Sequence, residues 1–77
     1  MARKKQPTAG EVITANIMYF KSTTGIEDEP LYLAARLGRT AWYDRLKHPE
    51  KFRIAELMGI ARKFDVPLMC LIEPKEV

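Results

Sequence analysis

Apolar residues recur at helical spacing in the stretch from Glu11 to Lys21, the first amphipathic segment of the chain. Ile13, Ile17 and Phe20 are separated by four and three residues, which places them on one face of an α-helix. Three more apolar side chains widen this stripe: Val12, Met18 and Tyr19. The pattern predicts a helix whose apolar face is buried.

Both ends of this first helix carry capping signals. Thr8 or Gly10 is expected to cap the N-terminus, and Glu11 is placed to stabilise the positive end of the helix dipole. Gly25 is expected to end the helix in the left-handed conformation, after the polar run of residues 22–24.

A second helix is predicted to begin in the acidic run of residues 27–29. Asp28 is its expected N-cap, and Pro30 is tolerated in the first turn because its missing N–H has no helical partner there. The side chains expected to face inward are Leu31, Ala34 and Ala35. A turn over residues 35–38 follows, in which Gly38 is expected to relieve the backbone as the chain reverses.

The third predicted helix spans residues 39–47 and starts directly after that turn. Trp42 and Leu46 lie one helical turn apart and are expected to pack inward, together with Leu37 from the turn. A helix, a short turn that contains glycine and a second helix form the outline of a helix-turn-helix. The rest of the chain is then expected to support this pair.

Two more helices are predicted after the loop around Pro49. The first is expected to be the main core element, and its inward residues at helical spacing are Ile54, Leu57, Ala61 and Phe64. Gly59 within it indicates either a closely packed neighbour or simple tolerance, and Asp65 is expected to end the helix. Pro67 opens a final helix over residues 68–72. The pattern as a whole predicts an all-α domain of five helices.

The outer side of the final helix is expected to carry Met69 and Cys70, because Leu68, Leu71 and Ile72 point to the other side. Exposed apolar residues there indicate either a homodimer contact or an extension of the core. The pattern alone does not choose between the two.

The composition is that of one small folded domain, with 77 residues of which 47% are hydrophobic and 30% charged. Residues 1–9 form a predicted flexible basic arm, residues 10–73 the helix-turn-helix domain and residues 74–77 a short tail. A single cysteine cannot form an internal disulfide. The basic start is not followed by the apolar region of a signal peptide, and no apolar run of membrane length occurs, so neither secretion nor membrane insertion is indicated. A soluble cytoplasmic protein without membrane association is therefore expected.

Catalysis and metal binding find little support in the sequence. There is no Gly-rich phosphate loop and no Ser/His/Asp constellation, and a small helical domain offers little pocket volume. His48 has no second histidine and no nearby cysteine with which to complete a metal site. No enzymatic activity, cofactor, metal site or small-molecule substrate is expected.

The net charge of +3 is unevenly distributed along the chain. Residues 1–26 carry four basic and one acidic side chain, and residues 27–29 carry three acidic ones. Residues 30–53 carry six basic and two acidic side chains, and residues 54–77 sum to −1. The positive charge thus lies on the arm and on the predicted helix-turn-helix, which suits a phosphate-facing surface, although solvated faces often carry such a charge.

The outward face of the 39–47 helix is the candidate DNA-reading surface. A helix enters the major groove with its N-terminal residues against base edges, where Arg39 can hold guanine and the Thr40 methyl can touch thymine. The residues expected to read bases are Arg39, Thr40, Ala41, Tyr43 and Asp44. Asp44 can instead form an ion pair with Arg39 or Arg45. The alternative for the whole face is a solvated amphipathic surface.

Phosphate contacts are expected beside that helix, chiefly in the basic loop that follows it. Each phosphate that the loop neutralises would steepen the salt dependence of binding. The residues expected to bind phosphate are Gly38, Lys47, His48, Lys51 and Lys21. The arm residues Arg3, Lys4 and Lys5 either lie along DNA or form a solvated tail.

Several short motifs follow one another without gaps over residues 25–72. The strongest part is Arg39-Thr-Ala-Trp-Tyr-Asp-Arg-Leu46, then Pro49, Glu56-Leu57 and Ile60-Ala61. This series resembles the lambda-repressor/Cro-like (Xre-type) helix-turn-helix family, especially its small phage and prophage members. The resemblance implies a compact five-helix domain that binds double-stranded DNA sequence-specifically and regulates transcription.

The chain departs from the usual residues of that family at four positions. Asp28 stands where relatives often have a phosphate-binding Gln, and Gly38 stands where Ser usually caps the reading helix. Tyr32 and Arg36 replace Ala and Gly in the second helix and the turn. The alternative function is a protein-interaction adaptor that keeps the fold, has lost DNA contact and meets its partner through residues 27–29 and Met69-Cys70.

Overall fold

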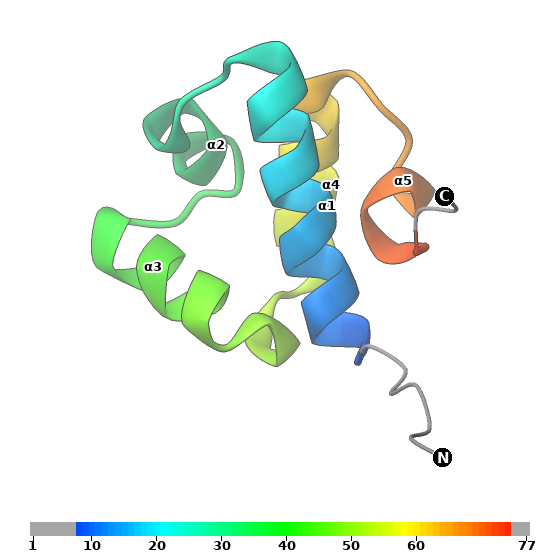
Figure 1. Cartoon of the computed structure of the whole chain (residues 1–77). Coiled ribbons are helices and arrows are strands. Elements are labelled where there is room, and N and C mark those ends of the chain that lie inside the picture. Colours follow the sequence, from blue (N-terminus) through cyan, green and yellow to red (C-terminus); the bar gives the residue numbers. More distant parts are fainter. Residues whose placement is uncertain (1–7, 75–77) are drawn as a thin grey trace.

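Five α-helices and one 3₁₀ turn make up the computed structural model, which describes residues 8–74 (Figure 1). In chain order the elements are α1 (Ala9–Thr24), α2 (Asp28–Ala34), α3 (Arg39–Lys47), η1 (Pro49–Lys51), α4 (Ile54–Phe64) and α5 (Met69–Ile72). No strand occurs among residues 8–74. The predicted all-α class with five helices is therefore confirmed.

Each of the five α-helices contributes one fully buried side chain to a common core. In chain order these residues are Ile17, Leu31, Trp42, Ile60 and Leu71. The ring of Trp42 packs against those of Tyr32 and Phe52, with centroid distances of 6.4 and 6.1 Å. The largest side chain of the core thus fixes α3 to the rest of the molecule.

The first helix, α1, extends beyond the predicted segment at both ends. The Thr8 hydroxyl accepts from the N–H of Glu11 at 3.1 Å, and the Glu11 carboxylate accepts from the N–H of Thr8 at 2.8 Å. This capping box starts the helix, and Gly25 ends it at φ 74°, as predicted. The prediction that Met18 and Tyr19 widen the buried stripe is wrong, because both step around the helix to its exposed side.

The start of α2 and the turn after it differ from the prediction at Asp28 and Gly38. The N-cap of α2 is Glu27, without a side-chain capping bond; Asp28 is the first helical residue and its carboxylate is bound by neighbouring helices. Gly38 is extended at φ −83° and caps α3, whereas the left-handed residue of the turn is Arg36 at φ 61°.

Backbone hydrogen bonds explain why the reversal falls on Arg36. Its N–H donates to the carbonyl of Leu33 at 3.0 Å, and the N–H of Leu37 donates to the carbonyl of Tyr32 at 2.8 Å. This pair of bonds closes the end of a helix only when the residue in the position of Arg36 is left-handed. The hydrogen bonding of α2 therefore sets the turn, and glycine is not required for it.

Close packing of α2 on α4 occurs at Gly59, where an added Cβ would lie 2.2 Å from the carbonyl oxygen of Ala34. This confirms the first of the two interpretations of Gly59. Asp65 ends α4 at φ 61°, as predicted. Ile54 was expected in the core but is 59% exposed, because it is the first residue of α4 and its side chain points back toward the N-terminus, away from the core. Ile60 is fully buried and was missing from the predicted core.

The last helix, α5, is held against α1 by a buried amide. The Asn16 side chain donates to the carbonyls of Leu71 and Glu73, at 2.8 and 2.9 Å. Met69 lies exposed on the outer side, as predicted. Cys70 was predicted on the same side but is half-buried, because α5 is a single turn that packs closely on α1.

Candidate nucleic-acid interface

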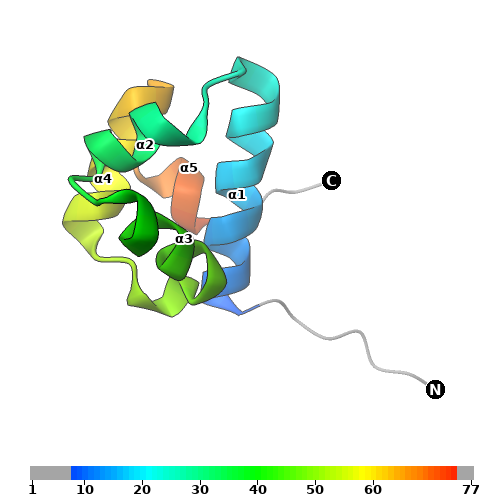
Figure 2. The ribbon, with the colours of Figure 1, turned by 90° about the vertical axis from the view of Figure 1, so that its left-hand side faces the viewer.

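One side of α3 is buried and the other faces outward. Trp42 is fully buried and Leu46 packs against the core. Figure 2 shows α2 and α3 together on the face turned toward the viewer, with α1 at the right and α4 at the left. The exposed residues of α3 are Arg39, Thr40, Tyr43 and Lys47. These residues are four of those that the sequence predicts to contact DNA.

The predicted base-reading residues differ in how free their polar groups are. Arg39 and Thr40, at the N-terminal end of α3, have side chains without a hydrogen bond or ion pair to the described residues. Ala41 is half-buried and carries only a methyl group. The Tyr43 hydroxyl donates to Oδ2 of Asp28 at 3.1 Å. The two residues at the helix start are therefore the most available.

The carboxylate of Asp44 is shared between two basic neighbours. Lys51 Nζ lies 3.5 Å and Arg45 Nη1 lies 3.9 Å from Asp44 Oδ2. Of its two predicted arginine partners, Asp44 thus pairs with Arg45. In the loop itself, His48 Nδ1 lies 3.7 Å from Glu50 Oε2. These contacts order the loop. The side chain of Lys51 nevertheless remains 54% exposed and can still reach a phosphate.

Two of the predicted phosphate contacts are both exposed and free of an ion pair with the described residues. Gly38 is exposed, and no heavy atom lies within 4 Å of a Cβ added to it, so its backbone can be approached closely. Lys47, at the other end of α3, is exposed and pairs with no carboxylate of the described residues. The two positions bracket the outward side of the helix.

Asp28 joins three helices at the edge of this surface. Lys21 from α1 donates to its Oδ1 and Tyr43 from α3 donates to its Oδ2. Burial by itself raises the pKa of Asp28, but the hydrogen bonds from Lys21 and Tyr43 outweigh burial and lower this pKa below 3.8. The hydrogen bond to Asp28 raises the pKa of Tyr43. The charge of Lys21, a predicted phosphate contact, is therefore paired within the protein.

An acidic hollow of about 560 Å³ lies between the start of α2 and the start of α3. Its walls include Glu27, Glu29 and Arg39. Glu27 and Glu29 are exposed and pair with no basic side chain of the described residues. One flank of the outward side is therefore negative, which disfavours phosphate there.

A further ion pair, between Arg45 and Glu56, holds α3 to α4 and was missed from the sequence. Arg45 Nε and Nη2 donate to the two carboxylate oxygens of Glu56, at 3.1 and 3.2 Å, and the N–H of Arg53 donates at 3.0 Å. Burial raises the pKa of Glu56, but these donors outweigh it and lower this pKa below 4.5. No local spacing signals a pair whose members lie in different helices.

Some predicted features lie outside the described residues, namely Arg3, Lys4 and Lys5 of the arm and residues 75–77 of the tail. Within residues 8–74, no three His, Cys, Asp or Glu side chains group closely enough to hold a metal ion. None of the helices described is both long and apolar enough to cross a membrane.

Comparisons with models of protein families, with curated proteins and with solved structures found no match to this chain. Function is therefore inferred from the side chains that α3 presents. From the N-terminal to the C-terminal end of α3 they are the guanidinium of Arg39, the hydroxyl of Thr40, the phenol of Tyr43 and the ammonium group of Lys47. Only the phenol is bound to another side chain of residues 8–74, the carboxylate of Asp28. Such groups hydrogen-bond to base edges and to phosphate oxygens.

Proposed function

We propose that the chain is a sequence-specific double-stranded DNA-binding protein with a lambda-repressor-like helix-turn-helix, a small transcriptional regulator of the phage or prophage type. One observation carries this proposal: α3 is locked to the core by Trp42, while its N-terminal end presents Arg39 and Thr40 without partners among the described residues. A single α-helix fits the DNA major groove, which is about 12 Å wide.

The proposed contacts follow from the positions of the side chains along α3. Arg39 binds a guanine edge through paired N–H donors, and the Thr40 methyl contacts thymine. Gly38 and Lys47 bind phosphates at the two ends of the helix. The hydroxyl of Tyr43 stays on Asp28, so this residue contributes its ring.

The charges around α3 define which side carries the DNA backbone. Glu27 and Glu29 repel phosphate on the α2 side, whereas Lys47 and Lys51 attract it on the side of the loop. Asp44 binds Lys51 and Arg45 and therefore orders the loop rather than reading cytosine. Apart from the contact at Gly38, the contacts with the DNA backbone are proposed to concentrate at the C-terminal side of α3.

Selection of bound duplexes from a random pool tests the proposal directly. A specific reader enriches a defined sequence. A palindromic sequence indicates a homodimer, for which Met69 on the outer side of α5 is the proposed contact, and a single half-site indicates a monomer. A pool that shows no enrichment contradicts the proposal.

Single variants separate base reading from phosphate binding on the selected duplex. Arg39→Ala is expected to lower affinity on the order of tenfold and to relax preference at one base pair. Lys47→Ala is expected to weaken binding to all duplexes and to reduce the slope of log K against log salt by about one. Lys63→Ala, an exposed lysine on α4, is the control and should change neither. Identical behaviour of the three variants contradicts the assigned roles.

A protein-interaction adaptor is the second candidate function, and the acidic hollow beside Arg39 favours it. Exposed Glu27 and Glu29 suit a basic protein surface better than DNA. An adaptor predicts no duplex binding even at about 50 mM salt, where phosphate contacts are strong. Binding that falls steeply as salt rises would exclude it.

A further inference from the structure

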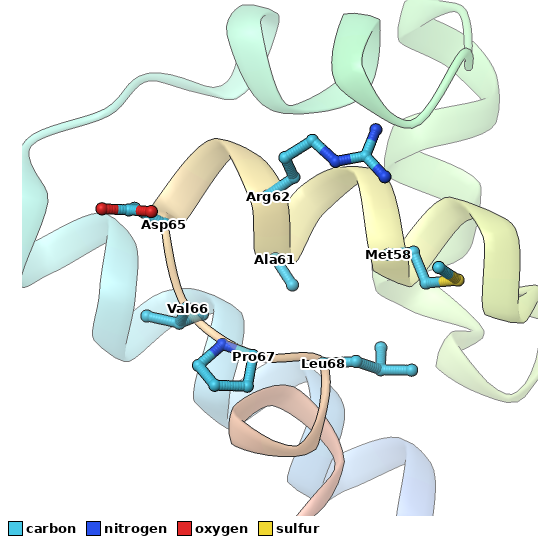
Figure 3. A pocket seen from close by; sticks show the side chains of 7 residues that line it. All are labelled: Met58, Ala61, Arg62, Asp65, Val66, Pro67 and Leu68. Atoms are coloured by element: carbon cyan, nitrogen blue, oxygen red, sulfur yellow. The ribbon is translucent and has the colours of Figure 1, made fainter.

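Two hollows flank α4 and share two of its side chains, Met58 and Arg62. The first, of about 400 Å³, lies between α4 and the segment that leads to α5, where Val66, Pro67 and Leu68 form an apolar wall (Figure 3). The second, of about 450 Å³, lies between α4 and the end of α2. Together the hollows form one continuous surface across α4.

Three arginines from different parts of the chain line the second hollow. Arg36 belongs to the turn after α2, Arg53 directly precedes α4 and Arg62 lies within α4. All three are exposed, and none forms an ion pair with a carboxylate of the described residues. Glu56 also lines this hollow, but Arg45 already holds its carboxylate. The guanidinium groups are thus left to attract an anion.

The surface also has an apolar part. Met58 is 45% exposed on the ridge that the two hollows share. Ala34 and Gly59 line the second hollow with little more than backbone, because the two residues meet there. Figure 3 shows Asp65 at the far end of α4 from Met58, and Arg62 on the opposite side of α4 from Pro67. One side of the ridge is therefore basic and the other mainly apolar.

We propose that this surface binds an acidic protein segment that carries an apolar side chain. Carboxylates of the segment meet the three arginines, since guanidinium groups bind carboxylates through paired N–H donors. Its apolar side chain packs on Met58 and the wall of the first hollow, because methionine adapts to varied shapes. A DNA backbone would leave the apolar wall uncovered. This binding does not depend on the proposed reading of DNA by α3.

A selection of short random peptides, displayed on phage, against the immobilised full chain tests the proposal. The enriched peptides are expected to combine several Asp or Glu residues with an apolar residue. Labelled copies of these peptides should lose affinity on the order of tenfold on Arg36→Glu, on Arg62→Glu and on Met58→Ala. Lys63→Glu makes the same charge change next to Arg62 but lines neither hollow, so affinity should be retained.

The remaining outcomes overturn the proposal. They are no enrichment over the bare support, enriched peptides without acidic residues, and equal losses on Lys63→Glu and Arg62→Glu. Displacement of the selected peptides by a mixed-sequence DNA duplex, to an extent that Arg39→Ala and Lys47→Ala leave unchanged, assigns the hollows to nucleic acid and also overturns the proposal. Matching thermal unfolding midpoints of the variants ensure that lost binding is not lost folding. Duplex binding through Arg39 is measured separately, so either proposal can fail alone.

Discussion

Arg36 has both a backbone role and a surface role. Its φ of 61° places it in the left-handed region, where a side chain costs roughly 1–2 kcal/mol relative to glycine. It is nevertheless a positively charged residue that lines the hollow between α2 and α4. Its left-handed backbone closes the turn at a cost in stability, whereas its guanidinium group contributes positive charge to the surface.

The glycine variant separates these two roles. Arg36→Gly is expected to raise the free energy of unfolding by about 1 kcal/mol, because the left-handed strain disappears. Arg36→Ala removes the same charge but keeps the strain, so it should give no such gain. Urea unfolding of the two variants and the parent chain measures the difference. Equal stability of the glycine and alanine variants would contradict strain at this position.

At the scale of elements, the approach of α2 to α4 is set by a missing side chain. Gly59 lies where a Cβ would overlap the backbone oxygen of Ala34, so the crossing needs glycine despite its poor helix propensity. Gly38 is the useful contrast, since it has open space around it and an ordinary φ of −83°. Two glycines in one helical chain therefore serve different purposes.

This contrast gives a paired prediction. Gly59→Ala is expected to destabilise the fold by about 3 kcal/mol, because the clash with backbone outweighs the gain of about 1 kcal/mol in helix propensity. Gly38→Ala should cost less than about 1 kcal/mol, since alanine is only a poorer N-cap. Thermal unfolding followed by circular dichroism compares them. Similar losses in both variants would show that the crossing at Gly59 is not tight.

The bounds of α3 could be predicted because Gly38 and Pro49 enclose it and Trp42 with Leu46 marks its inner face. The caps of α1 could also be predicted, because a helix cap depends only on residues that are close together in the sequence. The predictions that were wrong depend on tertiary contacts. The sequence around Asp28 is typical of an N-cap, but in the fold Lys21 and Tyr43 donate to its carboxylate. Helical periodicity was enough to predict which side of α3 faces outward, whereas the pairing of the polar groups on that side required the fold.

At the scale of the whole molecule, two carboxylates connect the helices. Asp28 joins α1, α2 and α3, and Glu56 joins α4 to α3 through Arg45. The pKa values of both carboxyls lie below their ordinary values. A lowered pKa means that the stabilisation is complete above the unfolded pKa and is lost as pH falls through the folded pKa. Stability is thus expected to decline as the pH falls below the ordinary carboxyl pKa values, 4.5 for Glu56 and 3.8 for Asp28.

The contribution of Glu56 can be isolated by its amide. Glu56→Gln is expected to lower the free energy of unfolding by about 2 kcal/mol at neutral pH, because charged hydrogen bonds to Arg45 are lost. Between about pH 6 and about pH 3 the variant should lose less stability than the parent chain. Glu29→Gln removes an exposed carboxylate that pairs with no basic side chain of the described residues, and it is the control. Urea unfolding across this pH range measures both, and parallel curves for parent and Glu56→Gln would contradict the prediction.

Trp42 is the only tryptophan of the chain, and it is fully buried on the inner side of α3. Its fluorescence therefore reports on the packing of α3 against Tyr32, Phe52 and the rest of the core. A ligand that docks on the outward side without moving the helix leaves the emission unchanged, whereas one that lifts α3 exposes the indole and shifts the emission to longer wavelength. The protein thus carries its own optical probe, which distinguishes rigid docking from rearrangement.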